Sequence, residues 1–177
     1  HRRSSAASDV YKRQEVMTTQ FSWISTASCI SMVGATPVFC EIDALTYHMS
    51  LDSIKKMYSD KVKAIVYPHL FGYMSETKEI IEFCKEKQIA FIEDAAQSLG
   101  ASLNGVKAGS IGDISTLSFN ANKVVAGIAG GGAILTDDED KAEMFRKLRK
   151  HGEREILGYN SKMLLMNAEF INFRLNR

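Results

Sequence analysis

Short apolar runs alternate with amphipathic stretches along most of the chain. The runs that predict strands are rich in β-branched residues and cover residues 37–42, 64–67, 90–93, 114–119 and 132–136. Strands that alternate with helices are typical of an α/β domain built on a mainly parallel sheet. We therefore expect a mainly parallel central sheet flanked by helices.

The stretches between these runs have apolar residues at helical spacing. They predict helices over residues 25–32, 51–58, 76–87 and 137–151. In the third of these, Ile80, Ile81 and Cys84 share one face, and we expect Ser75 to cap its N-terminus. The fourth begins with acidic residues and ends with basic residues before Gly152, an order of charges that suits the helix dipole.

The chain divides into three parts by composition. Residues 1–14 contain no sustained apolar stretch and resemble translated sequencing-adapter read-through, so we treat them as a non-native or disordered leader. No linker interrupts residues 15–152, which we expect to form one large domain. Residues 153–177 begin with a charged turn and end in an apolar stretch without a clear helix stop, which predicts the start of a truncated C-terminal segment.

Composition narrows the classes of partner. The chain has 177 residues, with 22 lysines and arginines against 21 acidic residues, so it offers no general attraction to nucleic acid or to an anionic membrane. Its longest apolar runs are far shorter than the roughly 20 residues of a membrane helix. The cysteines Cys29, Cys40 and Cys84 are odd in number and widely spaced, which favours reduced thiols in a cytoplasmic protein over disulfides or a metal site.

Candidate chemistry lies at the ends of two predicted strands. Asp94 follows one strand, and Lys123 lies 29 residues later, after the strand that ends near Ser118. Ligands of open α/β sheets bind beyond the carboxyl ends of the strands, so these groups are expected to face one ligand. Pyridoxal 5'-phosphate (PLP) needs a lysine to form a Schiff base and a carboxylate to keep its pyridine nitrogen protonated. Asp94 and Lys123 suit these roles, and Ser118 is a candidate phosphate donor.

Each of these residues also has a structural explanation when it is taken alone. Asp94 could cap a helix, Lys123 could be a solvated surface lysine, and Ser118 could be a hydroxyl at the edge of the core. Only their combination favours a cofactor site. The glycines at 130–132 lack the Gly-x-Gly-x-x-Gly spacing and precede a strand, which argues against dinucleotide binding.

The segment from about residue 15 to 170 resembles the DegT/DnrJ-type PLP-dependent sugar aminotransferases. The motifs that carry the resemblance are residues 21–27, 33–39, 69–72, 93–98, 109–113, 118–123 and 130–133. The resemblance implies an aspartate-aminotransferase-like fold, of which this chain holds the large domain while the small C-terminal domain is missing. Members of the family have further segments on both sides, so the isolated chain is expected to be a poorly active enzyme fragment.

The resemblance implies a role for each candidate residue. Lys123 holds PLP covalently and moves the proton at the substrate carbon, and Asp94 pairs with the pyridine nitrogen. Gln97 lies beside the ring near its phenolic oxygen, and Ser118 contacts the phosphate. Trp23 stacks on the ring face, as a flat aromatic side chain can do by offset packing. The alternatives are that Trp23 is a core aromatic and that Gln97 is a surface amide.

A second part of the site is implied to come from another subunit. Asn160 matches a family asparagine that reaches the cofactor phosphate of the partner subunit, which implies a homodimer with shared sites. Lys162 stands where the family more often has arginine, so a bidentate guanidinium contact is absent at this position.

The activity implied is transamination of a nucleotide-linked keto-sugar, with glutamate as amino donor, in amino-sugar or surface polysaccharide biosynthesis. Two alternatives remain open from the sequence. One is a non-catalytic PLP-binding protein with a regulatory or structural role. The other is a PLP-dependent sugar dehydratase, which Lys123 disfavours because the dehydratases of this family carry histidine at that position.

Overall fold

The computed structural model describes residues 14–176, apart from the side chain of Arg154. Its centre is a six-stranded sheet of order β2–β1–β3–β4–β7–β8. The strands are β1 (Glu15–Thr19), β2 (Thr36–Cys40), β3 (Val62–Pro68), β4 (Ala90–Asp94), β7 (Ile114–Ser118) and β8 (Gly132–Leu135). All neighbouring strands pair in parallel except β8, which runs antiparallel to β7. The predicted mainly parallel sheet is therefore confirmed.

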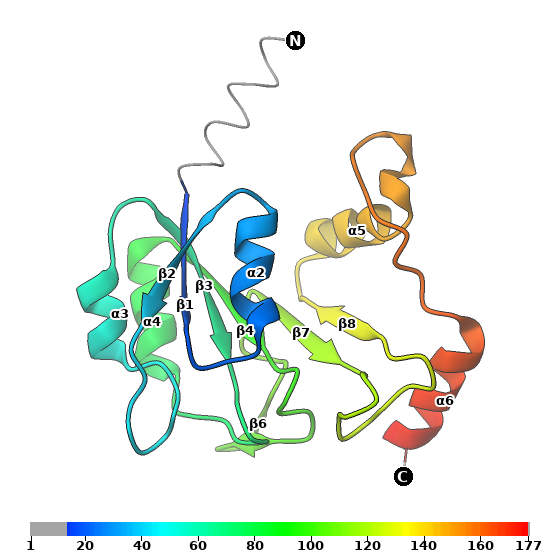
Figure 1. The fold of residues 1–177 in the computed structure, drawn as a ribbon, viewed down its shortest axis with the longest axis horizontal. Helices are drawn as coiled ribbons and strands as arrows, with labels where there is room; N and C mark the ends of the chain where they lie inside the picture. The colour runs from blue at the N-terminus through cyan, green and yellow to red at the C-terminus, as the bar shows by residue number, and fades with distance from the viewer. Residues whose placement is uncertain (1–13, 177) are drawn as a thin grey trace.

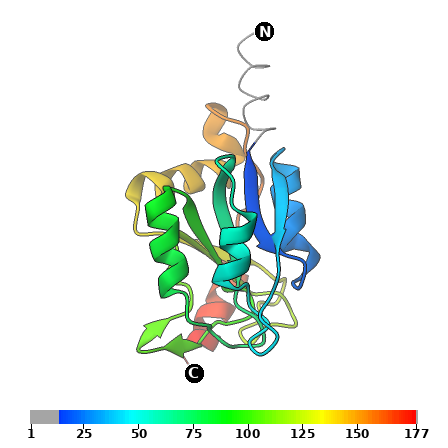
Figure 2. The same cartoon turned by 90° about the vertical axis from the view of Figure 1, so that its left-hand side faces the viewer.

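Helices cover both faces of this sheet (Figures 1 and 2). They are α2 (Ile24–Met32), α3 (Leu51–Met57), α4 (Lys78–Lys87), α5 (Glu139–Leu148) and α6 (Leu165–Leu175), with a short 3-10 turn η1 (His151–Arg154) after α5. Because parallel crossovers are right-handed, the connection from β1 to β2 places α2 on one face, and the connections from β2 to β3 and from β3 to β4 place α3 and α4 on the other. The winding direction reverses between β1 and β3, the kind of point where α/β sheets bind ligands.

The main core lies between the sheet and the helices α3 and α4. Its most buried members include Met17, Ile54, Ile65 and Phe91. Five consecutive residues of β3 are buried, as expected for an inner strand that is covered on both faces. This packing fixes the positions at which the strands end, and the candidate site lies just beyond those ends.

Some elements differ from the sequence predictions. The strand β1, the helix α6 and a small hairpin of β5 (Ser102–Leu103) and β6 (Val106–Lys107) were not predicted. The predicted Ser75 cap is wrong, because α4 begins at Lys78 and Thr77 occupies its N-cap position. The Ser75 hydroxyl instead lies 2.6 Å from the buried Tyr67 hydroxyl. A buried phenol needs a hydrogen-bond partner, and this need decides where the serine points.

The remaining predictions on organisation have different outcomes. Residues 1–13 of the predicted leader lie outside the described residues, and the division of the chain at residue 152 stays a prediction. The three cysteines are unpaired, with Cys29 exposed and the other two buried. Burial raises the pKa of Cys40 to about 11 and that of Cys84 to about 12, so both thiols stay protonated and unreactive at neutral pH. Within residues 14–176 no helix combines the length and the apolarity needed to cross a membrane.

Candidate active site

Four of the predicted site residues lie at the carboxyl edge of the sheet, the lower edge in Figure 1. Asp94 is the last residue of β4, and Ser118 is the last residue of β7. These strands are neighbours, with Asp94 in register with Thr116, so Ser118 lies two residues further along the adjacent strand. Lys123 follows in the loop after β7, and Trp23 opens α2 just after β1. The topology thus brings the carboxylate, the hydroxyl, the lysine and the indole to one edge.

The carboxylate of Asp94 is held by donors on both oxygens. The Thr26 hydroxyl donates to Oδ2 over 3.2 Å, and the backbone N–H of Ala96 donates to Oδ1 over 3.1 Å. The Ser22 hydroxyl lies 2.9 Å from that of Thr26 and extends the chain of hydroxyls. These contacts orient a half-buried anion at the end of a rigid strand. Sequence reasoning missed Thr26, since no local pattern links it to a residue 68 positions away.

Trp23 lies on the same helix as the threonine that contacts Asp94. It occupies the N-cap position of α2, three residues before Thr26, and residues at this spacing share one face of a helix. Its side chain is 71% exposed. The alternative that Trp23 is a core aromatic is therefore wrong, and its indole is free to pack against a ligand at this edge.

Gln97 is half-buried and faces the loop that follows β3. Its Oε1 accepts a hydrogen bond of 3.3 Å from the backbone N–H of Phe71, a residue with the left-handed φ of 58°. The amide therefore holds a strained turn at the switch point of the sheet. Among the described residues, the amide nitrogen of Gln97 has no hydrogen-bond partner, so it is available to a ligand.

Asn160 lies apart from the other five predicted residues. It forms an isolated antiparallel bridge with Lys150, and the two residues flank the turn η1 beyond α5. Its side chain is exposed. The structure therefore does not bring Asn160 to the carboxyl edge of its own chain, and a role in a shared site requires a second subunit.

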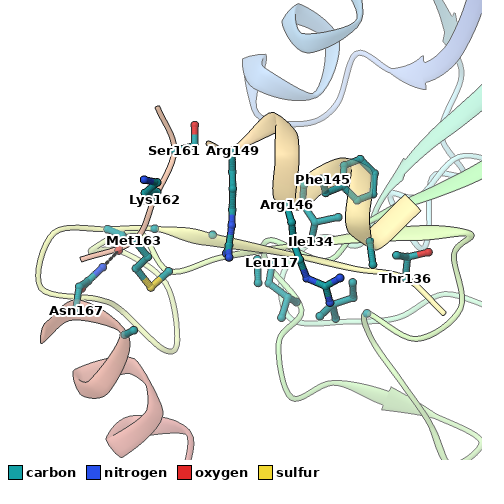
Figure 3. Close-up of a pocket in the computed structure, with 18 of the residues that line it drawn as sticks. Leu117, Ile134, Thr136, Phe145, Arg146, Arg149, Ser161, Lys162, Met163 and Asn167 are labelled. Atoms are coloured by element: carbon teal, nitrogen blue, oxygen red, sulfur yellow. Dashed lines mark hydrogen bonds between the residues drawn. The ribbon is translucent and has the colours of Figure 1, made fainter. Parts of the chain in front are cut away.

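A cavity of about 1480 Å³ runs along β8, one of the two edge strands of the sheet. Figure 3 shows the side chains that line it, among them Arg146, Arg149 and Lys162, with Asn167 of α6 at its far end. None of the six predicted cofactor residues lines this cavity. It is a separate feature from the carboxyl edge where Asp94 and Lys123 lie.

The buried carboxylate of Glu93, next to Asp94, binds the loop that precedes β7. Glu93 is fully buried and accepts hydrogen bonds from the backbone N–H groups of Gly109 and Ile111, at 2.6 and 3.1 Å, and from the Ser115 hydroxyl at 2.8 Å. The ring of His69 lies 3.4 Å from its Oε1. Burial by itself would raise the pKa of Glu93, but the hydrogen bonds from these partners lower it by more, and the pKa falls to about 2. Glu93 thus fastens the loop before β7 onto β4.

Replacement of Glu93 by glutamine is expected to lower the free energy of unfolding by about 3 kcal/mol, because hydrogen bonds to a charged group are each worth roughly 1.5–3 kcal/mol. The new amide would also turn a donor toward one of the backbone N–H groups. Urea titration of the purified protein measures the change. The matched control is Glu86→Gln on the exposed face of α4, which should leave stability nearly unchanged. Equal stabilities of the two variants would show that the buried carboxylate is not anchoring the loop.

The stabilising effect of Glu93 should also disappear in acid. Its pKa is about 2 in the folded chain against an ordinary value of 4.5. A depressed pKa stabilises the fold above pH 4.5, and the contribution is lost as the pH falls toward 2. The difference in unfolding free energy between the wild type and Glu93→Gln should therefore shrink by about 2 kcal/mol between pH 7 and pH 3. Urea titrations at pH 7, 5 and 3 test this, and a constant difference would contradict it.

Comparison with known proteins gives a consistent set of relatives. The sequence model of the DegT/DnrJ/EryC1/StrS aminotransferase family matches residues 4–177. The chain is 36% identical over 173 residues to a pleiotropic regulatory protein of Geobacillus stearothermophilus, covering 95% of this chain and 46% of the relative. It is 35% identical over 166 residues to a UDP-N-acetyl-3-dehydro-alpha-D-glucosamine 3-aminotransferase of Acidithiobacillus ferrooxidans, covering 88% and 45%. The chain thus spans less than half the length of these relatives.

Solved structures of aminotransferases have the same fold as this chain. An aminotransferase from Psychrobacter cryohalolentis superposes with a TM-score of 0.91 at 31% identity, over 97% of this chain and 48% of that one. The PLP form of a sugar aminotransferase from Streptococcus pneumoniae superposes with a TM-score of 0.87 at 25% identity, over 97% and 52%. The arrangement of the sheet and its helices is thus the fold of these enzymes. The chain belongs to the DegT/DnrJ/EryC1/StrS aminotransferase family.

Proposed function

We propose that the protein is a PLP-dependent aminotransferase that transfers an amino group, with glutamate as donor, to a nucleotide-linked keto-sugar. The observation that carries the proposal is the placement of Asp94 and Ser118 at the ends of adjacent strands, with Lys123 in the following loop. The names of relatives, such as GDP-perosamine synthase of Caulobacter vibrioides, support the class of substrate. The chain spans less than half the length of these relatives, so the activity is proposed for the protein expressed from the complete gene.

The groups at the carboxyl edge fit PLP in their chemistry. A half-buried carboxylate with donors on both oxygens suits a protonated pyridine nitrogen, since a fixed anion favours a nearby positive charge. The Ser118 hydroxyl suits a phosphate oxygen, and the exposed indole of Trp23 suits the face of a flat ring. When bound, PLP supplies an electron sink that stabilises negative charge at the substrate carbon.

The residues of this chain then have separate tasks. Lys123 would hold the cofactor covalently, and its amine would move the proton at the substrate carbon. Asp94 would keep a proton on the pyridine nitrogen, and Thr26 orients the Asp94 carboxylate for that role. Gln97 would lie beside the ring, and its contact with the Phe71 backbone fixes the direction of its amide.

The position of Asn160 supports a shared site in a homodimer. Its exposed side chain lies away from the carboxyl edge of its own subunit, so it is available to a second copy of the chain. We propose that it contacts the cofactor phosphate of the partner subunit. We also propose a cytoplasmic location, in keeping with the unpaired thiols of Cys40 and Cys84.

The deciding experiment locates the cofactor. The protein expressed from its complete gene is incubated with PLP, reduced with borohydride and digested, and the phosphopyridoxyl group is mapped by mass spectrometry. We expect the label on Lys123 and formation of 2-oxoglutarate from glutamate. Label scattered over surface lysines, with no 2-oxoglutarate formed in the presence or absence of keto-sugars, would overturn the proposal.

A regulatory function is the second candidate, because the Geobacillus relative is named a pleiotropic regulatory protein. In that case Lys123 would serve only to hold the cofactor. A strain that carries Lys123→Ala separates the two candidates. An intact phenotype with no transaminase activity favours regulation, and a lost phenotype restored by the amino-sugar product favours catalysis.

A further inference from the structure

The segment that carries Lys123 is a glycine-containing loop closed at its base. The backbone N–H of Phe119 donates to the carbonyl of Gly131 over 2.9 Å, and that of Gly127 donates to the carbonyl of Phe119 over 2.8 Å. Between these two bonds the loop extends away from the sheet. The backbone N–H of Lys123 itself closes a turn by donating to the carbonyl of Asn120 over 2.9 Å. The arm that leads to β8 contains Gly130 and Gly131, with left-handed φ values of 73° and 131°, and because glycine adopts many conformations this arm depends on contacts from outside to keep one shape.

Those contacts come from α6. The side chain of Asn167 is only 5% exposed, and its amide uses both ends on successive loop residues. Its Nδ2 donates to the carbonyl of Gly130 over 2.6 Å, and its Oδ1 accepts from the backbone N–H of Ala129 over 3.3 Å. Figure 3 shows this side chain pointing from α6 into the loop. Seven residues later, Arg174 donates to the carbonyl of Val124, the residue after Lys123, over 3.3 Å.

The loop is shaped around this amide. A Cβ atom at Gly127 would lie 2.5 Å from Asn167 Oδ1 and 3.0 Å from the side chain of Ile171, one turn further along α6. A Cβ atom at Gly131 would lie 2.8 Å from the end of the Met163 side chain and in ordinary contact, at 3.5 Å, with Asn167 Nδ2. The loop therefore lies close against α6 because it carries glycine at the points of contact, and this close approach lets one buried amide reach two backbone groups.

We propose that Asn167 is a positioning residue, which holds the loop so that the Lys123 amine keeps its place beside the cofactor. The inference rests on the proposed function, since it is the attachment of PLP to Lys123 that makes the place of the loop matter. A displacement of about 1 Å in a reacting group can cost on the order of a hundredfold in rate. A glycine loop without its clamp would spend much of its time displaced.

The test compares Asn167→Asp with Asn172→Asp in the protein expressed from its complete gene. The first change is isosteric but replaces the amide donor with a carboxylate oxygen that faces the Gly130 carbonyl. The second is the same substitution at an exposed position of the same helix. Asn167→Ala serves as a second variant, which removes the clamp without adding charge.

Hydrogen exchange is measured first, without cofactor. In both Asn167 variants we expect amide exchange of residues 119–131 to be about tenfold faster, while residues 62–68 of β3 and the Asn172→Asp control stay unchanged. With PLP and glutamate, kcat should fall about tenfold in the Asn167 variants while KM changes less than about twofold. A loss that appears in kcat alone marks misplacement of the lysine rather than lost substrate binding.

The outcomes separate the two proposals. Unchanged exchange of residues 119–131 in both Asn167 variants overturns the positioning role, as does faster exchange with unchanged kcat. Absence of borohydride-stable label on Lys123 in the wild type overturns the proposed function instead. The exchange data, collected without cofactor, then still decide whether Asn167 restrains the loop.

Discussion

Replacement of Lys123 by alanine is expected to abolish the borohydride-stable attachment of PLP and to lower kcat by about 10²–10⁴-fold. The magnitude is that of a positioned group that transfers a proton in the transition state, and alanine has no amine to do so. The rate of 2-oxoglutarate formation from glutamate measures the loss. A small primary amine added to the solution should restore part of the activity, because it can carry the missing proton.

The matched control is Lys56→Ala, on an exposed position of α3 away from the carboxyl edge. It should keep the label and the activity of the wild type. If Lys123→Ala kept more than about a tenth of the wild-type rate, Lys123 would not be the group that moves the proton. Label found on a different lysine in the wild type would assign the attachment to that residue instead.

The ends of the strands could be predicted because they follow from local pattern. The run at residues 64–67 is continuously apolar, and residues 90–92 are apolar before the two acidic residues Glu93 and Asp94; such runs become inner strands of a parallel sheet. Polar residues that directly follow them must lie at the carboxyl edge. The position of Asp94 at the carboxyl edge can therefore be predicted from its own strand, without the order of the strands in the sheet.

Two elements carry no such pattern. In β1 only Val16 and Met17 are apolar, and the other buried positions are Thr18 and Thr19, so the strand does not form an apolar run. In α6, Asn167 and Ile171 are buried while Leu165 is 77% exposed, so apolar side chains occur on more than one side of the helix. An amphipathic stripe is the main sign of a surface helix, and it is weak here.

The contacts that shape the site are also invisible to local reading. Thr26 reaches Asp94 across 68 positions, and Asn167 reaches Gly130 across 37. Thr26, Asp94 and Asn167 are common polar residues, and the partner of Asn167 is a backbone carbonyl, so the local sequence marks neither contact. Only the packing of α2 and α6 against the ends of the strands makes them partners. The sequence therefore indicates the candidate reacting groups, while tertiary structure decides which groups hold them.

Replacement of Asp94 by asparagine is expected to lower kcat by about 10²–10³-fold, the order seen when one preorganised electrostatic group is removed from an active site. Asparagine keeps the size of the side chain but removes the negative charge that favours a proton on the pyridine nitrogen. The Thr26 hydroxyl and the Ala96 N–H, which now donate to the two carboxylate oxygens, cannot both keep an acceptor. The change in charge and the change in orientation therefore act in the same direction.

Two measurements distinguish this electrostatic role from a structural one. The ¹⁵N chemical shift of the cofactor ring nitrogen should move toward the neutral form in Asp94→Asn, while the label on Lys123 persists. The matched control is Asp52→Asn, an exposed residue in the first turn of α3, which should change neither kcat nor the shift. A protonated ring nitrogen together with wild-type kcat in Asp94→Asn would mean that another group supplies the charge. The ring nitrogen would then have to lie away from the end of β4, and the orientation proposed for the cofactor would be wrong.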